Sequence, residues 1–321
     1  MKEYAEFQAV LEAKQRIKDF VYRTPLIRAH AMDQLMGGAE VYLKPECLQI
    51  TGSFKLRGAA NKILSLTPEQ RKNGVITTSS GNHGQGVAYA ARECGVPAVV
   101  CMPTVASPYK VERVRALGAE AVVIGTFNDE TEVTAHVIEQ ERGMAYIHAY
   151  NDKYVLAGQG TMGLEILEDL PDVDLIVTPI GGGGMIAGTS LAAKSMSKKV
   201  KVYGCEPVFV PRFGESRRQG KPVMLTPEHT TLADGIRTRV ARPLNFNMIE
   251  RYVDELVALK DEDIASAMKI ALANTKLTLE PTSAIVFAAG LTGLLPLKKG
   301  MKVCFVVSGG NAGAETLREY L

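Results

Sequence analysis

A lysine in a short polar segment is the first residue that could do covalent chemistry. Lys55 lies in TGSFKLRG (residues 51–58), and apolar residues at helical spacing follow it. We therefore expect Lys55 in the first turn of a helix. The positive helix end, together with burial, would lower the lysine pKa from about 10.4. Such an amine forms a Schiff base with an aldehyde, although a surface lysine at a helix start would explain this segment equally well.

Two glycine-containing loops could bind anions. SSGNHGQG (79–86) follows an apolar run and opens a helical segment, so its backbone N–H groups could hold a carboxylate. GGGGM (181–185) follows the run LIVTPI and predicts a phosphate cradle. The second loop also fits a dinucleotide fingerprint with Glu206 about twenty residues later. An ordinary helix cap would explain the first loop, and His83 in it is a packed or orienting side chain rather than a metal ligand.

A fourth segment, SGGN (308–311), ends the apolar run KVCFVV. A hydroxyl at the carboxyl end of a parallel strand points into the crevice where such sheets bind ligands. Ser308 is therefore a candidate binding residue, although a C-terminal turn is the simpler reading of this segment alone.

The elements that must position these residues alternate along the chain. Apolar, β-branched runs at 75–78, 98–102, 121–125, 175–179, 201–206 and 302–308 alternate with segments of helical spacing. This alternation predicts parallel, doubly wound α/β sheets. We expect a small domain at 50–148, inserted into a larger domain formed by 1–49 and 149–321. The basic segment 212–227 is expected to be a solvated loop, with an effector contact as the alternative.

Composition excludes several classes of protein. The 321 residues carry a net charge of only +2 and are 46% hydrophobic, which argues against a nucleic-acid binder or a disordered chain. The charged N-terminus lacks a signal-peptide pattern, and the uncharged run 175–193 is rich in glycine, so we expect a cytoplasmic protein without a membrane span. Five cysteines without a CxxC pair, and histidines without HExxH spacing, predict neither disulfides nor a metal site.

Taken together, these motifs resemble the fold type II pyridoxal-phosphate enzymes, specifically the serine/threonine dehydratase and serine racemase group. The resemblance runs from TPL (24–26) to SGGN and includes AGQGT (157–161), ADG (233–235) and EPT (280–282). It implies two doubly wound parallel-sheet domains of the tryptophan synthase β type, with the active site in the cleft between them. It also implies a homodimer or higher homo-oligomer that acts on a small amino-acid substrate.

The resemblance also assigns roles to individual residues. Lys55 would bind pyridoxal 5'-phosphate covalently, Phe54 would lie against it, and Ser308 would face its pyridine nitrogen. Asn82 would bind the ring hydroxyl. The substrate carboxylate would be received by the loop of Ser79, Ser80, Gly81 and His83, and the cofactor phosphate by Gly181, Gly182, Gly183, Gly184 and Met185.

Several positions depart from the patterns of this group. Ser80 stands where many dehydratases have Ala, whereas serine racemases use a serine there as an acid and base. Arg212 stands where members with a divalent-metal site have Asp, six residues after the residue matching Glu206, so we expect no metal. The sequence His148-Ala149-Tyr150 replaces the usual His-Pro-Phe or His-Pro-Asn. The chain ends soon after SGGN, so we expect neither the regulatory C-terminal domain nor feedback by isoleucine.

The resulting hypothesis is an ammonia-lyase that converts a β-hydroxy amino acid, such as threonine or serine, to a 2-oxo acid and ammonia. Lys55 would remove the α-proton, and the cofactor would store the electron pair. Serine racemase and threo-3-hydroxyaspartate ammonia-lyase are the alternatives within the group. An NAD-dependent oxidoreductase using the glycine run with Glu206 is a remote alternative, and so is a non-catalytic cofactor-binding protein.

Overall fold

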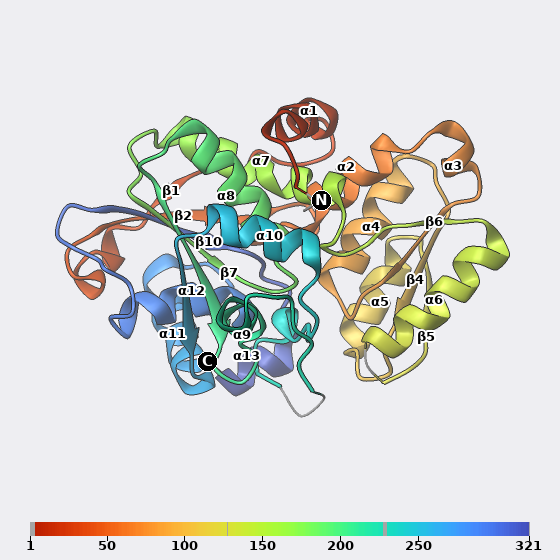
Figure 1. Ribbon diagram of the computed structural model, residues 1–321. Helices are drawn as coiled ribbons and strands as arrows, with labels where there is room; N and C mark the ends of the chain where they lie inside the picture. Colours follow the sequence, from red (N-terminus) through yellow and green to blue (C-terminus); the bar gives the residue numbers. More distant parts are fainter. Residues whose placement is uncertain (1–3, 127, 227–229, 321) are drawn as a thin grey trace.

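The computed structural model describes residues 4–126, 128–226 and 230–320, and its described strands form two sheets (Figure 1). The larger sheet has the order β1-β2-β10-β7-β8-β9, and the smaller has the order β5-β4-β3-β6. The strands are β1 (Ile27–Arg28), β2 (Glu40–Pro45), β3 (Val75–Thr78), β4 (Ala98–Met102), β5 (Glu120–Val123), β6 (Ala145–Tyr146), β7 (Leu175–Pro179), β8 (Lys201–Pro207), β9 (Glu255–Leu259) and β10 (Lys302–Val307).

Helices cover the faces of both sheets, which form two lobes joined near the N-terminal helix α1 (Phe7–Ile17) (Figure 1). The small lobe carries α3 (Pro68–Lys72), α4 (Asn82–Glu93), α5 (Pro108–Ala116) and α6 (Asn128–Arg142). The other helices are α2 (Lys55–Ser65), α7 (Lys153–Asp169), α8 (Gly184–Met196), α9 (Arg212–Gln219), α10 (Pro243–Tyr252), α11 (Asp261–Thr275), α12 (Pro281–Leu291) and α13 (Ala314–Tyr320).

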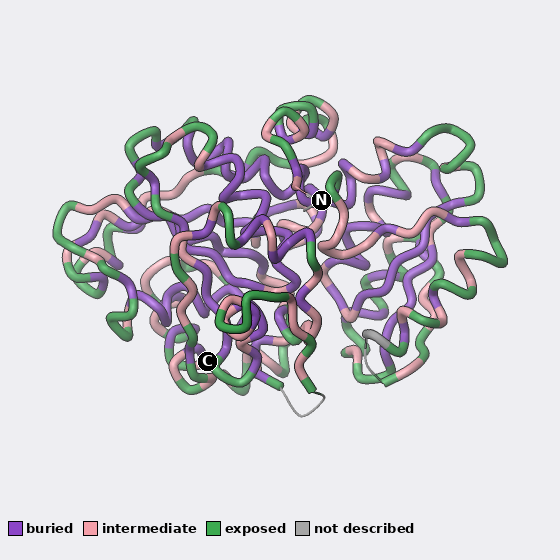
Figure 2. The backbone as a smooth tube through the Cα atoms, in the orientation of Figure 1, coloured by how far each residue is buried: buried purple, intermediate pink, exposed green. Residues whose placement is uncertain are grey.

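The parallel pairing of the strands explains why the sequence contains continuous β-branched runs. All described pairings between the named strands are parallel except that of β1 with β2. Helices on both faces bury a parallel strand completely, and every residue of β3 and β7 is buried (Figure 2). The predicted parallel α/β architecture is therefore confirmed, and the division into domains at 50–148 stays a prediction.

The expectation of a solvated loop at 212–227 is wrong for its first part. Residues 212–219 form α9, and Arg212, Phe213 and Ser216 on one face of this helix are buried. The low hydrophobicity of the segment concealed the helix, because a buried arginine forms part of its inner face. Pro227, at the end of the expected loop, lies outside the described residues.

Among the described residues, no helix combines the length and the apolar character that crossing a bilayer requires.

Candidate active site

Lys55 is the first residue of α2, as the sequence predicted, and its side chain is turned into the protein. The Nζ atom donates a hydrogen bond to the carbonyl of Ala149 at 3.0 Å and lies 5.2 Å from the centre of the Phe54 ring. Burial lowers the pKa of Lys55 to about 8, although the negative charge of Glu280 acts in the opposite direction. Near neutral pH a usable fraction of this amine is therefore unprotonated, and burial is the main cause.

The glycine run connects the end of β7 to the start of α8. Gly183 has a φ of 87°, a left-handed conformation that favours glycine. Among the described residues, no hydrogen bond uses the backbone N–H of Gly181, Gly182 or Gly183. Three unpaired N–H groups beside the positive end of a helix suit a phosphate. The ring of Tyr150 packs against Gly182, since a Cβ on this glycine would lie 2.2 Å from the ring.

The loop before α4 is the candidate substrate site. The hydroxyl of Ser79 accepts a hydrogen bond from the N–H of Gly81 at 3.1 Å, and Ser80 is half-buried beside it. His83 is buried, and its Nε2 lies 3.0 Å from the carbonyl of Ile147. Burial lowers the pKa of His83 to about 3, so its ring is neutral in this site.

Asn82 belongs to a network that the motifs alone did not reveal. Its amide nitrogen donates to both carboxylate oxygens of Glu280 at 2.9 Å, and its amide oxygen accepts from Asn311 at 2.9 Å. The amide oxygen of Asn82 has a second lone pair, which could accept a hydrogen bond from a cofactor hydroxyl while both present partners are kept. Burial raises the pKa of Glu280 to about 7. EPT, the motif that contains Glu280, was the only signal in the sequence for this residue.

Ser308 lies directly after β10 and is buried. Its hydroxyl is 3.0 Å from that of Ser283, and its carbonyl accepts a hydrogen bond from the N–H of Phe54 at 3.0 Å. The segment that carries Lys55 is thus joined to the segment that carries Ser308. Since Lys55 also contacts Ala149, beside Tyr150, the structure brings the amine, the glycine run and this serine together.

An ion pair between Lys110 on α5 and Asp234 crosses from one lobe to the other. Lys110 also packs over the substrate loop, because a Cβ on Gly81 would lie 2.7 Å from its side chain. Sequence reasoning missed this pair, and no local signal could have identified it, since the partners are 124 residues apart.

The residues present fit pyridoxal phosphate better than a dinucleotide. Both carboxylate oxygens of Glu206 accept N–H groups of α9, from Phe213 at 3.0 Å and Gly214 at 2.8 Å, so this carboxylate is not free to bind a ribose. The unpaired glycine N–H groups and the buried Lys55 amine instead suit a ligand that carries both a phosphate and an aldehyde. Among the described residues, no group of three or more His, Cys, Asp or Glu side chains could hold a metal ion.

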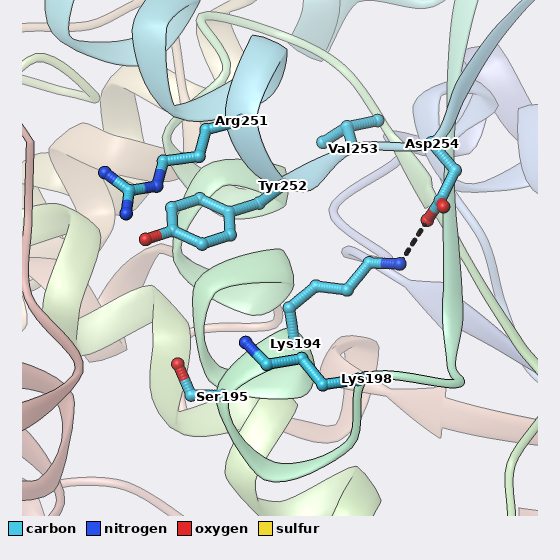
Figure 3. Close-up of a pocket in the computed structure, with 7 residues that line it drawn as sticks. All are labelled: Lys194, Ser195, Lys198, Arg251, Tyr252, Val253 and Asp254. Atoms are coloured by element: carbon cyan, nitrogen blue, oxygen red, sulfur yellow. Dashed lines mark ion pairs between the residues drawn. The ribbon is translucent and has the colours of Figure 1, made fainter.

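A separate surface pocket of about 390 Å³ lies at the opposite end of α8 from the glycine run (Figure 3). Three cations, Lys194, Lys198 and Arg251, line it together with Ser195, Tyr252, Val253 and Asp254, and Lys194 is paired with Asp254 at 2.6 Å. None of the candidate active-site residues lines it.

Comparisons with known proteins identify the family of this chain. The family described as "Pyridoxal-phosphate dependent enzyme" matches residues 17–309. An L-threonine ammonia-lyase of Thermotoga maritima is 45% identical over 94% of this chain and 74% of its own length. The structure of maize serine racemase has a TM-score of 0.92 at 35% identity, covering 98% of this chain and 96% of that one. The processed form of threonine deaminase isoform 2 from Solanum lycopersicum has a TM-score of 0.91 at 31% identity, covering 99% and 89%.

Proposed function

Because the chain belongs to the pyridoxal-phosphate dependent enzyme family, we propose that it is an ammonia-lyase that converts a β-hydroxy amino acid, with threonine as the leading candidate, to a 2-oxo acid and ammonia. The observation that carries the proposal is the buried, partly neutral amine of Lys55 beside unpaired phosphate-binding N–H groups. The names of relatives at 45% and 42% identity support threonine as substrate.

Residues of the chain would hold different parts of the cofactor. Gly181, Gly182 and Gly183 would hold the cofactor phosphate, and Lys55 would hold its aldehyde. Ser308 would face the pyridine nitrogen as a neutral hydroxyl, which favours loss of a β-substituent over transamination. When bound, pyridoxal phosphate supplies an electron sink for the substrate's α-carbon.

Lys55 would move the α-proton, and the loop before α4 would bind the substrate carboxylate. The neutral Nζ of Lys55 would take the α-proton, and its low pKa keeps the required base available near neutral pH. The N–H groups at the start of α4, with the hydroxyls of Ser79 and Ser80, would bind the substrate carboxylate. The buried surroundings exclude water from the base, which is why its pKa is lowered.

Racemisation is the second candidate function, and Ser80 is the observation that favours it. A base on one face of the α-carbon and a hydroxyl on the other could exchange the α-proton from both sides. The likeness to maize serine racemase at 35% identity supports this candidate. We further propose that the chain works in the cytoplasm as a homo-oligomer, which its similarity to an L-threonine ammonia-lyase and the family resemblance support.

A substrate panel tests the proposal. The holoenzyme should release ammonia and a 2-oxo acid from L-threonine or L-serine faster than from threo-3-hydroxyaspartate. Lys55→Ala should abolish both the visible cofactor absorbance and the release of ammonia. Ammonia release that survives in Lys55→Ala, or absence of release from every β-hydroxy amino acid, would overturn the proposal.

The Ser80→Ala variant separates the two candidate functions. We expect deamination to persist in this variant and any racemisation of serine to disappear. Chiral chromatography measures the racemisation. If the wild-type enzyme produces no D-serine from L-serine, the racemase candidate fails. If racemisation survives in Ser80→Ala, Ser80 is not the second-face group.

A further inference from the structure

Arg212 is a fully buried cation whose hydrogen bonds are directed almost entirely at backbone carbonyls. Nε donates to Gly181 at 2.9 Å and Nη2 donates to Ile180 at 2.6 Å, while Nη1 donates to Ile236 at 3.1 Å and to Thr238. Nη2 also lies 3.8 Å from a carboxylate oxygen of Glu206. A guanidinium has five N–H donors, so four serve carbonyls and one is left on the side of Glu206.

Two of these carbonyls belong to the loop proposed to bind phosphate. The carbonyl of Ile180 shares its peptide group with the N–H of Gly181, and the carbonyl of Gly181 shares its peptide group with the N–H of Gly182. In a trans peptide the C=O and the N–H point in opposite directions, and the described residues contain no cis peptide bond. Holding these carbonyls against Arg212 therefore turns both N–H groups toward the opposite side.

Asn245 on α10 acts in the same way on the next peptide. Its side-chain nitrogen donates to the carbonyl of Gly182 at 2.6 Å, which directs the N–H of Gly183. Three successive carbonyls are thus held by two buried side chains, and the three N–H groups of the same peptides have no partner among the described residues. Flexible glycines could not keep this arrangement by themselves, because their backbone has many accessible conformations.

We propose that Arg212 is a positioning residue for the cofactor phosphate: it fixes the direction of the glycine-run N–H groups without touching the phosphate. The proposal rests on the proposed phosphate site at residues 181–184. Glu206 keeps the guanidinium in place, since its carboxylate is itself anchored by the N–H groups of Phe213 and Gly214. Arg212 thereby orients the loop through hydrogen bonds from its own side chain.

The test compares the binding of pyridoxal 5'-phosphate and pyridoxal to the apoprotein. The two ligands differ only in the phosphate, so the ratio of their dissociation constants isolates the phosphate site. In Arg212→Lys, which keeps the charge but loses the planar fork, we expect the affinity for pyridoxal 5'-phosphate to fall at least tenfold. The affinity for pyridoxal should change less than twofold.

Two further variants separate positioning from a loss of stability. Asn245→Ala should also reduce the preference for pyridoxal 5'-phosphate over pyridoxal, because it frees the carbonyl of Gly182. Met268→Ala removes a fully buried side chain from α11, far along the chain from the glycine run, and should lower the thermal midpoint without changing the ratio. Both ligands are measured at a temperature where circular dichroism shows each variant to be folded.

The outcomes are distinguishable. If the wild-type protein does not prefer pyridoxal 5'-phosphate over pyridoxal, the phosphate site at the glycine run fails. If the wild-type protein has that preference and Arg212→Lys keeps it, the positioning role of Arg212 is wrong. An equal loss of affinity for both ligands in Arg212→Lys also contradicts the proposal, because positioning of the phosphate site predicts a selective loss.

Discussion

At Lys55, burial and charge act on the same amine in opposite directions. Burial disfavours the ammonium, whereas the carboxylate of Glu280 favours it, and burial prevails to give a pKa of about 8. Glu280 is itself only partly ionised near neutral pH, because its own pKa is raised to about 7 by burial. The two groups therefore control how much neutral amine the site contains.

The pH dependence of cofactor attachment to the apoprotein reports this balance. Only the neutral amine attacks an aldehyde, so the rate constant should rise with pH to a plateau. The midpoint of this rise should lie at about pH 8. In Glu280→Gln the opposing charge is absent, so the midpoint should move to lower pH. Stopped-flow absorbance measures the rate, and Lys55→Ala is the control that should show no attachment. A wild-type midpoint near 10.5, the ordinary lysine value, would contradict this account.

Residue-scale chemistry was partly predictable from the sequence. Lys55 and the glycine run lie in short motifs whose local structure follows from neighbouring residues. The Lys110–Asp234 pair and the carbonyl contacts of Arg212 depend on segments that only the folded chain brings together. Arg212 could therefore be singled out by its type and position in the sequence, but its hydrogen-bond partners could not.

At the scale of elements, the sequence predicted six of the described strands, including β8 and β10 with their charged residues, and missed the other four. The prediction placed β3, β4 and β7 at their observed bounds, because each is an apolar run buried on both faces. It missed the two-residue strands β1 and β6, and also β2, in which Glu40 and Lys44 bound a short apolar run, and β9, which begins at Glu255 and has only four further residues. Helix α12 is buried on nearly all sides, so its sequence shows no helical periodicity.

The contact between α7 and α8 depends on glycines where the two helices approach closely. A Cβ on Gly188 of α8 would lie 2.2 Å from the carbonyl oxygen of Leu156 on α7. Since α8 begins at the glycine run, this contact also fixes the helix that points at the proposed phosphate site. Backbone atoms cannot move aside as the end of a flexible side chain can.

Gly188→Ala should therefore destabilise the protein by about 3 kcal/mol, the upper part of the range for overpacking in a core. Urea unfolding of the apoprotein measures the change in free energy. The matched control is Gly313→Ala, because a Cβ on Gly313 meets no atom within 4 Å and its backbone is not left-handed. Equal stabilities of the two variants would show that the helices can separate without cost.

At the scale of the whole molecule, the two lobes meet around a set of ionisable groups that are mostly half-buried. Lys110 and Asp234 link the lobes directly, and Arg242 of the large lobe is paired with Glu132 of α6 at 3.3 Å. The same region contains His148, which lies 3.8 Å from Glu132 and accepts two backbone N–H groups through Nδ1. Closing the lobes thus removes titratable side chains from water, and this makes stability depend on pH.

Three groups with strongly shifted pKa values contribute to that dependence in mildly acidic solution. Burial lowers the pKa values of His83 and His148 from 6.5 to about 3, so the unfolded chain binds two more protons than the folded chain between these values. The pKa of Glu280 is raised from 4.5 to about 7, so the folded chain binds one more proton there. Summed over these three groups, the unfolded chain binds a net excess of one proton between pH 4.5 and 6.5, so their joint contribution to stability increases with pH.

A net difference of one proton corresponds to about 1.4 kcal/mol per pH unit, so the apoprotein should lose roughly 3 kcal/mol between pH 6.5 and 4.5. Glu280→Gln removes the opposing proton and should roughly double this slope. His148→Asn keeps an acceptor for the two N–H groups and should reduce the slope to near zero. Urea unfolding at half-unit pH intervals gives the three slopes. If all three proteins had the same slope, the interface between the lobes would not be the source of acid sensitivity, and exposed carboxylates elsewhere would have to account for it.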